Sequence, residues 1–418
     1  MGLWSGHGRK VEIAESFLQV LLTMLRRDGK LRRSSYPDIS ISAADEGDGL
    51  RSIWSAWVRH ESFKRLSFRM VRHDTNSSMA LLVSPLVSYA EVSLPFPDAA
   101  ELWLATNVDV WKSLFASRTN AQKINLVDYL DEPEVLRAHG GALDVGTAQS
   151  AFLSCVWRLS WEFIQLRSLQ RAAPRRWNTL IMASRQDELL KLVKHFQIST
   201  WPQLRSTVDL EMQVNHILLH LHMPLEDIQT FAGTEGPEQA SALHAKTAEW
   251  ARSEAARHAV YHAGQVIRAA KGFPRSMIQG PAAVMLYHAG LALWVYGLLS
   301  DQNPSTSKWS GIPSSSSSSS SVTAAHAVWL EEPDSLGIQR FTQFGSGSPY
   351  IRGVVPAQDS QASPVDVFLH HPEKVAAVVL DILRHNHEDM PRPPLVDCLI
   401  QLITAVQQSS WRALEVAV

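Results

Sequence analysis

Histidine pairs one helical turn apart are the residues of this chain whose spacing most plainly permits chemistry. Among 17 histidines, His216 with His220 and His258 with His262 have the i, i+4 spacing that places two imidazoles on one helix face, where they could bind zinc. No HExxH motif is present, and no carboxylate has a spacing that completes either pair. His222 points to another face than His220. We therefore favour partly buried, hydrogen-bonded histidines and expect no metal ligand, cofactor-binding residue or catalytic residue.

The cysteines exclude a zinc-based DNA-reading module within this sequence. Only Cys155 and Cys398 are present, so no CxxC pair exists for a six-cysteine cluster or a two-cysteine, two-histidine finger. Two free cysteines in so long a chain also indicate a reducing compartment.

Other catalytic and phosphate-binding motifs are absent from the sequence. There is no GxGxxG, no P-loop and no GxSxG, and the run from Gly345 to Ser348 precedes a proline, which indicates a turn. Acidic groups at 131–134 and 331–334 could pair as general acid and base. Each contains a proline, however, so helix N-termini are the favoured interpretation.

The charge balance gives no sign of a nucleic-acid-binding surface. Lys and Arg number 39 against 41 Asp and Glu, a net charge of −2, whereas a phosphate-binding module is usually basic. The cluster Arg26–Arg33 could serve as a weak nuclear-import signal, although a solvated helix C-terminus is the plainer interpretation. The 14 tryptophans could stack on bases, but without a basic excess we expect them in the core or a pocket.

Helical periodicity runs through most of the chain, and we predict an all-α, multi-helix array. Apolar residues at helical spacing predict helices at 11–27, around 189–196 and at 210–222, with a long helix from about 237 to 271. Two more are predicted near 373–386 and 394–408. No alternation of period two extends beyond five residues.

Residues 276–300 contain no charge and are long enough to span a bilayer. Pro281, His288, Gly290 and Gly297 interrupt the stretch, and no second span accompanies it. We expect a buried helix of a large core, with a membrane anchor as the alternative. Residues 301–325 include eight consecutive serines and are expected to form a flexible surface insertion.

Residues 54–111 carry the pattern most informative about family. They read WSAWVRHESFKRLSF and, after a polar turn, MALLVSPLVSYAEVSLPFPDAAELWLATNVDVW, with Glu61, Lys64 and Arg65 on the first predicted helix. This block resembles the opening of the regulatory "middle homology" domain of fungal-specific transcription factors, in the branch that follows a pair of zinc fingers. LHMPLEDIQTFAGTEG, YHAGQVIRAA, AVMLYHAGLALWVYGLL and VWLEEPDSLGIQRFTQFGSGSPYIRG continue the resemblance in the family's order, over roughly residues 9–410.

The resemblance implies a nuclear regulator of RNA polymerase II transcription rather than an enzyme. Its helical domain would control activity through effector or partner binding, with co-regulators or the transcriptional machinery as partners and homodimerisation as a further option. Zinc and DNA binding are expected only of a finger domain that this sequence does not contain. The alternatives are a helical enzyme acting on a small apolar substrate and a membrane-attached adaptor using residues 281–299.

The predicted organisation has four parts. Residues 1–49 form an N-terminal helix and polar connector, 50–300 the helical regulatory core, 301–325 the insertion, and 326–418 C-terminal helices that complete the core. Within the core, Pro95 and Pro97 forbid a continuous helix. We therefore expect Asp98 to cap a new helix whose Leu102 and Trp103 point into the core.

Overall fold

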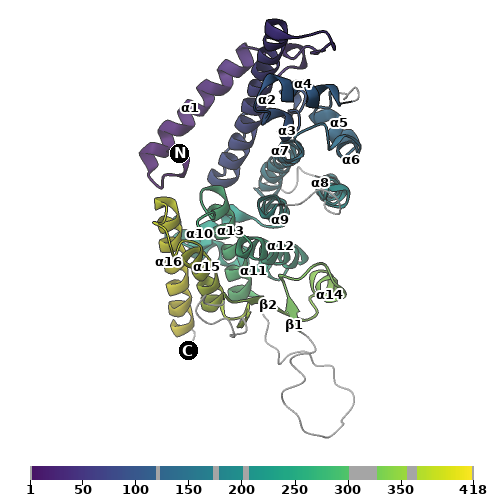
Figure 1. Ribbon diagram of the computed structural model, residues 1–418. Helices are drawn as coiled ribbons and strands as arrows, with labels where there is room; N and C mark the ends of the chain where they lie inside the picture. The colour runs from purple at the N-terminus through teal and green to yellow at the C-terminus, as the bar shows by residue number, and fades with distance from the viewer. Residues whose placement is uncertain are drawn as a thin grey trace. The chain divides into compact units, whose positions relative to one another are not determined.

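The computed structural model of the chain describes residues 2–118, 123–172, 178–200, 207–300, 327–354 and 365–416. Helices dominate these residues, which confirms the predicted all-α array (Figure 1). The chain forms two compact units. Unit 1 comprises Met1–Leu3 and Gly8–Leu210, and unit 2 comprises Trp4–His7 and Glu211–Val418. The predicted Ser-rich insertion lies outside the described residues, and the four predicted boundaries stay predictions.

Unit 1 is built around two long helices, α2 and α7, which pack against each other. Helices α1 and α4 also pack on α2, whereas α5 and α8 pack on α7. The helices are α1 (Gly8–Arg27), α2 (Gly47–Leu81), α3 (Ala100–Trp103), α4 (Val108–Ala116), α5 (Leu126–Asp131), α6 (Val135–His139), α7 (Val145–Ala172) and α8 (Thr179–Thr200), with 3-10 turns at Arg33–Ser35 and Tyr89–Glu91.

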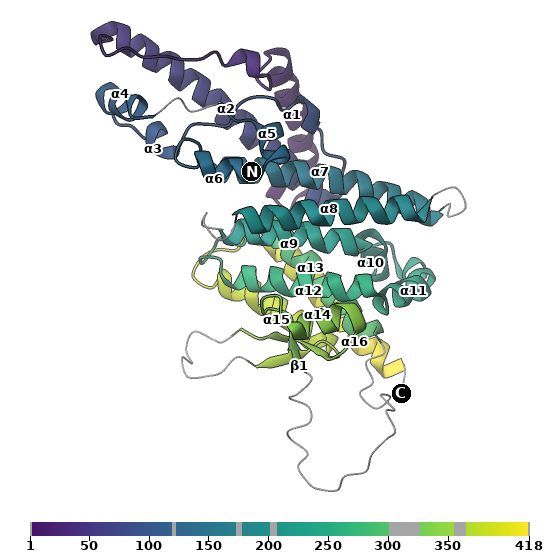
Figure 2. The ribbon, with the colours of Figure 1, turned by 90° about the vertical axis from the view of Figure 1, so that its right-hand side faces the viewer.

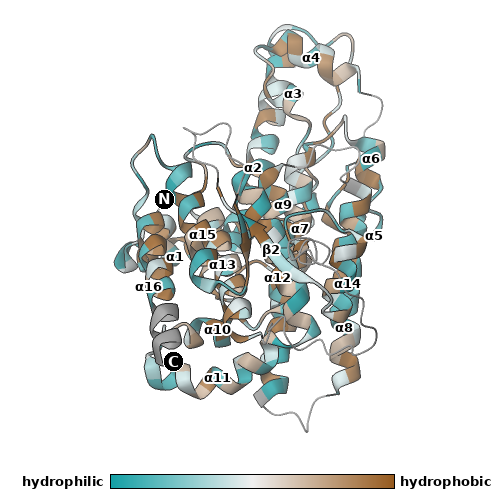
Figure 3. Ribbon diagram, turned by 90° about the horizontal axis from the view of Figure 1, so that it is seen from below, coloured by the Kyte–Doolittle hydropathy of each residue, from teal (hydrophilic) through white to brown (hydrophobic). Residues whose placement is uncertain are grey.

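Helix α1 follows the predicted range and ends at Arg27, within the basic cluster. Leu18, Leu22 and Leu25 are buried, whereas Phe17 and Met24 are exposed. Figure 3 shows hydrophilic and hydrophobic residues interleaved along most helices of the chain. Arg26 is not freely solvated, because its guanidinium pairs with the Glu91 carboxylate at 2.7 Å.

The predicted polar turn before Met79 is wrong, because α2 continues through it to Leu81. The polar side chains have partners inside the fold instead of water. The Asp74 carboxylate accepts hydrogen bonds from the backbone amides of Leu86 and Val87, at 2.9 and 2.8 Å. The Ser78 hydroxyl accepts one from the Trp157 indole at 2.9 Å. Tertiary partners therefore offset the cost of burying this polar run within a helix.

The structure also corrects the expectation for residues 94–103. Ala99, not Asp98, is the N-cap of the four-residue α3, and no side chain caps it. Leu102 is buried as predicted, but Trp103 is 36 % exposed. Trp103 lies at the surface beside Trp57 (ring centroids 6.3 Å apart) and beneath the Arg65 guanidinium.

Unit 2 is assembled around α13 (Pro281–Leu299), on which α10, α11, α12, α15 and α16 pack (Figure 2). The helices running through or within this unit are α9 (Val208–His222), α10 (Leu225–Phe231), α11 (Pro237–Ala251), α12 (Glu254–Lys271), α13, α14 (Leu336–Phe344), α15 (Pro372–Asn386) and α16 (Pro394–Val416).

Burial of α13 confirms the predicted core helix. Among the described residues it is the one helix long and apolar enough to cross a membrane, and 89 % of its most apolar window is buried inside the fold. Its glycines allow close packing. A Cβ at Gly297 would overlap the Leu369 carbonyl oxygen, and one at Gly290 would touch Val379.

The predicted long helix 237–271 is in fact two helices. α11 ends at Ala251, and α12 begins after Ser253, whose hydroxyl accepts a hydrogen bond from the Ala256 amide at 3.1 Å. Serine followed by Glu254 in the first turn is a helix-start pattern, and the cap satisfies an amide that would otherwise lack a partner.

A small three-stranded sheet accompanies the helices of unit 2, and the sequence did not predict it. β1 (Ala327–Trp329) runs parallel to β2 (Ser348–Arg352), which is antiparallel to β3 (Asp366–Phe368). In the register, Val328 lies opposite Pro349 and Ile351 opposite Val367. Strands of three to five residues are too short to give a clear alternation of period two.

Candidate functional site: a charged pocket in unit 1

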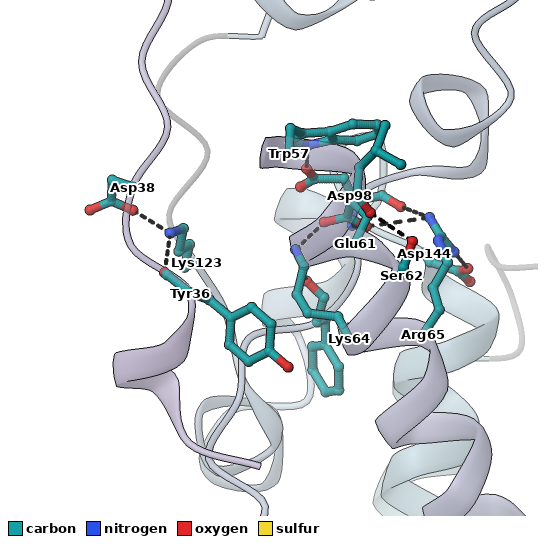
Figure 4. A network of polar contacts seen from close by, with 12 residues as sticks. Tyr36, Asp38, Trp57, Glu61, Ser62, Lys64, Arg65, Asp98, Lys123 and Asp144 are labelled. Atoms are coloured by element: carbon teal, nitrogen blue, oxygen red, sulfur yellow. Dashed lines mark hydrogen bonds and ion pairs between the residues drawn. The ribbon is translucent and has the colours of Figure 1, made fainter. Parts of the chain in front are cut away.

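Helix α2 places three charged side chains on one buried face of unit 1. Glu61, Lys64 and Arg65 have i, i+3 and i, i+4 spacing, so their side chains are neighbours. Glu61 is 0 % exposed and Lys64 is 5 % exposed. The Lys64 ammonium forms an ion pair with Glu61 Oε1, and Arg65 Nη2 lies 3.6 Å from Glu61 Oε2. These are the charges quoted above as part of the family resemblance, now found at the centre of a polar network (Figure 4).

The loop before α3 and the start of α7 complete this network. The Asp98 amide donates to Glu61 Oε2 at 3.1 Å, and the Trp57 indole donates to Asp98 Oδ2 at 2.8 Å. Arg65 donates to Asp144 Oδ2 and to the Asp98 carbonyl, both at 2.7 Å. Asp98 thus holds the loop against α2 instead of capping α3, and sequence spacing gave no signal of that role.

Burial controls the protonation of the groups in the network. It raises the pKa of Glu61 above its ordinary value, although the neighbouring Lys64 ammonium opposes the shift. It likewise raises the pKa of Tyr36 to about 12. Burial, with four cationic side chains nearby, lowers the pKa of His60. The tyrosine and the histidine are therefore neutral at pH 7.

A pocket of about 600 Å³ opens beside this network, within the size range of small-molecule sites. Four of its lining residues are aromatic, four are cationic and three are acidic. They are Tyr36, Trp57, Phe96 and Phe115; Arg33, Lys64, Arg118 and Lys123; and Asp38, Glu61 and Asp98. Four positive against three negative charges leave a balance of +1 with His60 neutral, so the pocket suits an anionic or polar group on an apolar body.

Basic side chains lie at one end of the pocket. The Lys123 ammonium donates to the Tyr36 carbonyl at 2.7 Å and pairs with Asp38 Oδ1 at 2.6 Å (Figure 4). The pair with Lys123 lowers the pKa of the exposed Asp38 carboxyl. Arg33 is exposed at this end and has no ion-pair partner among the described residues, so its guanidinium is available to an anion.

The carboxylates that line the pocket are each paired with a cation. The pairs are Glu61 with Lys64, Asp98 with Arg118 at 3.3 Å, and Asp38 with Lys123 at 2.6 Å. Ser40 and His60 also line the pocket, and no hydrogen bond joins their side chains in the described structure.

The histidine pairs singled out from the sequence lie in unit 2. His216 and His220 are buried on α9, where α13 brings His288 against them. In the second pair, the His258 ring stacks on His222 with centroids 5.1 Å apart, and His262 Nδ1 lies 3.1 Å from Asn215 Oδ1.

The acidic groups at 131–134 and 331–334 each directly precede a helix, as the prolines within them indicate. Glu134 is the N-cap of α6, without a side-chain cap bond. Glu331 is buried and forms an ion pair with Lys271 at 2.8 Å, while Ser335 caps α14.

Comparison with known proteins relates the chain to fungal transcription factors. It is 26 % identical over 330 residues to "Transcription factor MYCGRDRAFT_87993" of Zymoseptoria tritici, covering 71 % of this chain and 33 % of that protein. It is 24 % identical over 372 residues to "Transcription factor 1" of Elsinoe fawcettii, covering 83 % and 37 %. A shorter match of 111 residues, 26 % identical, is to "Transcription factor PfmaH" of Pestalotiopsis fici, covering 27 % of this chain and 11 % of that protein.

The chain thus spans about a third of the length of the first two relatives. No protein-family model and no solved structure matches it. The relationship supports a role in transcription and its regulation.

Proposed function

We propose that this chain is the regulatory, middle-homology-type domain of a fungal transcription factor and acts in the nucleus on RNA polymerase II transcription. The relationship to named transcription factors over most of this chain is the observation that carries the proposal. The domain controls output through an effector or a co-regulator, and it has no enzymatic activity. Contact with DNA is made by a separate zinc-finger region of the kind found in the family.

The unit 1 pocket supports effector binding in particular. Its aromatic walls can cover an apolar body, and Arg33 and Lys123 at one end can bind a carboxylate or another anion. A small amphipathic acid is the ligand class with matching chemistry.

A tethering assay tests the regulatory role. The full chain is fused to a heterologous DNA-binding domain, and a reporter with the matching operator is measured in a fungal host. We expect output to differ severalfold from that of the DNA-binding domain alone. Equal output in several growth conditions would contradict the proposal.

The pocket is tested by blocking its mouth. Ser40 is exposed and lines the pocket, so Ser40→Trp fills it without disturbing the core, whereas Ala44→Trp places the same side chain on nearby exposed surface as a control. Apolar carboxylic acids that raise the melting temperature of the wild type should not raise that of Ser40→Trp, while Ala44→Trp should respond normally. If no acid stabilises the wild type, the hypothesis of a small acidic effector is wrong, and regulation through a protein partner remains.

Absence of intrinsic DNA affinity follows from the charge balance. Fluorescence anisotropy with random duplexes at low salt gives binding its best chance, because counterion release is then most favourable. We expect no saturable binding, and a sub-micromolar dissociation constant would contradict this part of the proposal.

A further inference from the structure

Three buried imidazoles from two helices converge inside unit 2. His216 and His220 lie one turn apart on α9, and His288 lies near the middle of α13. Their exposed fractions are 0 %, 2 % and 1 %. Nothing in the proposed regulatory function requires a polar cluster at this place.

Two of the three distances between their ring nitrogens are close to those around a tetrahedral metal ion. His216 Nε2 lies 3.1 Å from His220 Nε2 and 3.1 Å from His288 Nδ1, and one nitrogen from each ring lies within 4.8 Å of the others. Zinc–nitrogen bonds of about 2.0–2.1 Å at tetrahedral angles separate neighbouring ligand nitrogens by about 3.3 Å. Small rotations of the rings would therefore bring all three lone pairs onto one ion.

Hydrogen bonding alone explains the arrangement less well. A neutral imidazole has one N–H and one lone pair, on different nitrogens. His216 Nε2 therefore either donates or accepts, and it can make a well-directed bond with only one of its two neighbours at 3.1 Å. A cation that accepts a lone pair from each ring uses both contacts at once.

The protonation state of the cluster agrees with metal binding. Burial lowers the pKa of His288 to about 3 and lowers that of His216 well below its ordinary value. Both rings are thus neutral at pH 7, the form in which imidazole binds metals.

We propose that His216 Nε2, His220 Nε2 and His288 Nδ1 form a site for a zinc-class divalent transition metal that ties α9 to α13. This goes against our sequence-based expectation, because the i, i+4 pair alone lacked a third ligand and His288 lies far away in sequence. Three protein ligands leave one position for water or hydroxide, as in other three-histidine sites. Because the ligands are buried, the metal is structural and enters as the chain folds.

The second histidine pair of the sequence serves as a matched control. His258 and His262 have the same spacing, but their third histidine, His222, is stacked at ring-centroid distances of 5.1 and 6.1 Å. Among the described residues, only the His216, His220 and His288 group has its ligand atoms close enough together to hold a metal.

The test measures how many metal ions the full chain binds. Protein is produced in zinc-supplemented cells and, separately, refolded from denaturant with one equivalent of Zn²⁺ or Co²⁺, so that burial cannot prevent loading. Metal is measured by mass spectrometry, and cobalt also by its tetrahedral visible absorption. We expect one ion per chain by either route and a higher melting temperature with metal than after chelation.

Two variants decide whether the ion is at this site. His288→Phe keeps a ring of similar size in an apolar helix, so the protein should stay folded, lose the bound equivalent and lose the metal-dependent rise in melting temperature. His258→Ala should keep both. No stoichiometric metal by either loading route, or equal metal in His288→Phe and the wild type, overturns the proposal.

Discussion

Helices α2 and α13 are central to their own units, yet they bury polar groups in opposite ways. α2 brings charged side chains inside, and Glu61 is balanced by Lys64 and Arg65 at close range. α13 has no charged residue, and the main polar feature of its middle is the neutral His288 ring.

The difference shows two routes to a stable polar interior. A buried ion pair recovers its desolvation cost only while both partners remain, whereas a neutral ring avoids most of that cost. In unit 1 the result is a fixed network of charged side chains beside a pocket. In unit 2 it is a compact group of neutral imidazole rings. The following changes, from the largest expected effect to the smallest, separate these two routes.

Lys64→Met should be the most destabilising of these changes. It leaves the Glu61 carboxylate buried without its closest cation, at a cost of about 3–5 kcal/mol of unfolding free energy. Lys191→Met, which breaks an exposed pair with Asp187, should cost less than about 1 kcal/mol. Urea denaturation measures both. The double variant Glu61→Leu with Lys64→Met should recover most of the loss, and failure to do so would mean that Lys64 stabilises by packing alone.

Two tryptophans near the same network test the revised position of α3. Trp111 is fully buried against Trp57 and Phe115, so Trp111→Ala should cost about 3–5 kcal/mol. Trp103→Ala should cost only about 1–2 kcal/mol of unfolding free energy, because the partly exposed Trp103 side chain loses only its contacts with Trp57 and Arg65. Equal losses in urea melts would restore the sequence-based expectation of a buried Trp103.

Acid should weaken unit 2 through its histidines. The pKa of His288 is about 3 in the folded chain against an ordinary 6.5. The contribution of the neutral His288 ring to the free energy of unfolding is therefore fully present above pH 6.5 and is lost as the pH falls. For metal-free protein, lowering the pH from 6.5 to about 5 should cost about 2 kcal/mol through this residue. His288→Phe should show a correspondingly flatter pH profile in denaturant titrations. The pH dependence due to Glu61 is the reverse. Because its pKa is raised in the folded chain, the contribution of Glu61 to stability decreases as the pH rises.

The break between α11 and α12 should give the smallest effect. Ser253→Ala removes the side-chain cap of α12 and should cost about 1 kcal/mol in a thermal melt. Ser241→Ala, at an exposed position within α11, is the control and should change stability by less than about 0.5 kcal/mol. If Ser253→Ala left the thermal stability unchanged, the helix would be interrupted at Arg252 and Ser253 for a reason other than this cap.

Local patterns were sufficient where one element alone carried the signal. Helical spacing located α1, α9 and α15 to within a few residues, and the uncharged stretch located α13. Helix α9 ends at His222, as the Met223–Pro224 pair predicts. Ser253 followed by Glu254 is also a helix-start pattern in the sequence, and the prediction of one helix over 237–271 did not take it into account. The prediction for Trp103 was wrong because successive side chains of a helix point about 100° apart, and in α3 only Leu102 faces the core.

By itself, the sequence determined the all-α class, the uncharged core helix at 281–299 and the resemblance to fungal regulators. Only the tertiary structure decided which polar residues are buried together. Asp98 meets α2 across 37 residues, and His288 meets His216 across 72. Neither contact follows from spacing within one helix, because its energy depends on the desolvation and the partners that packing alone supplies.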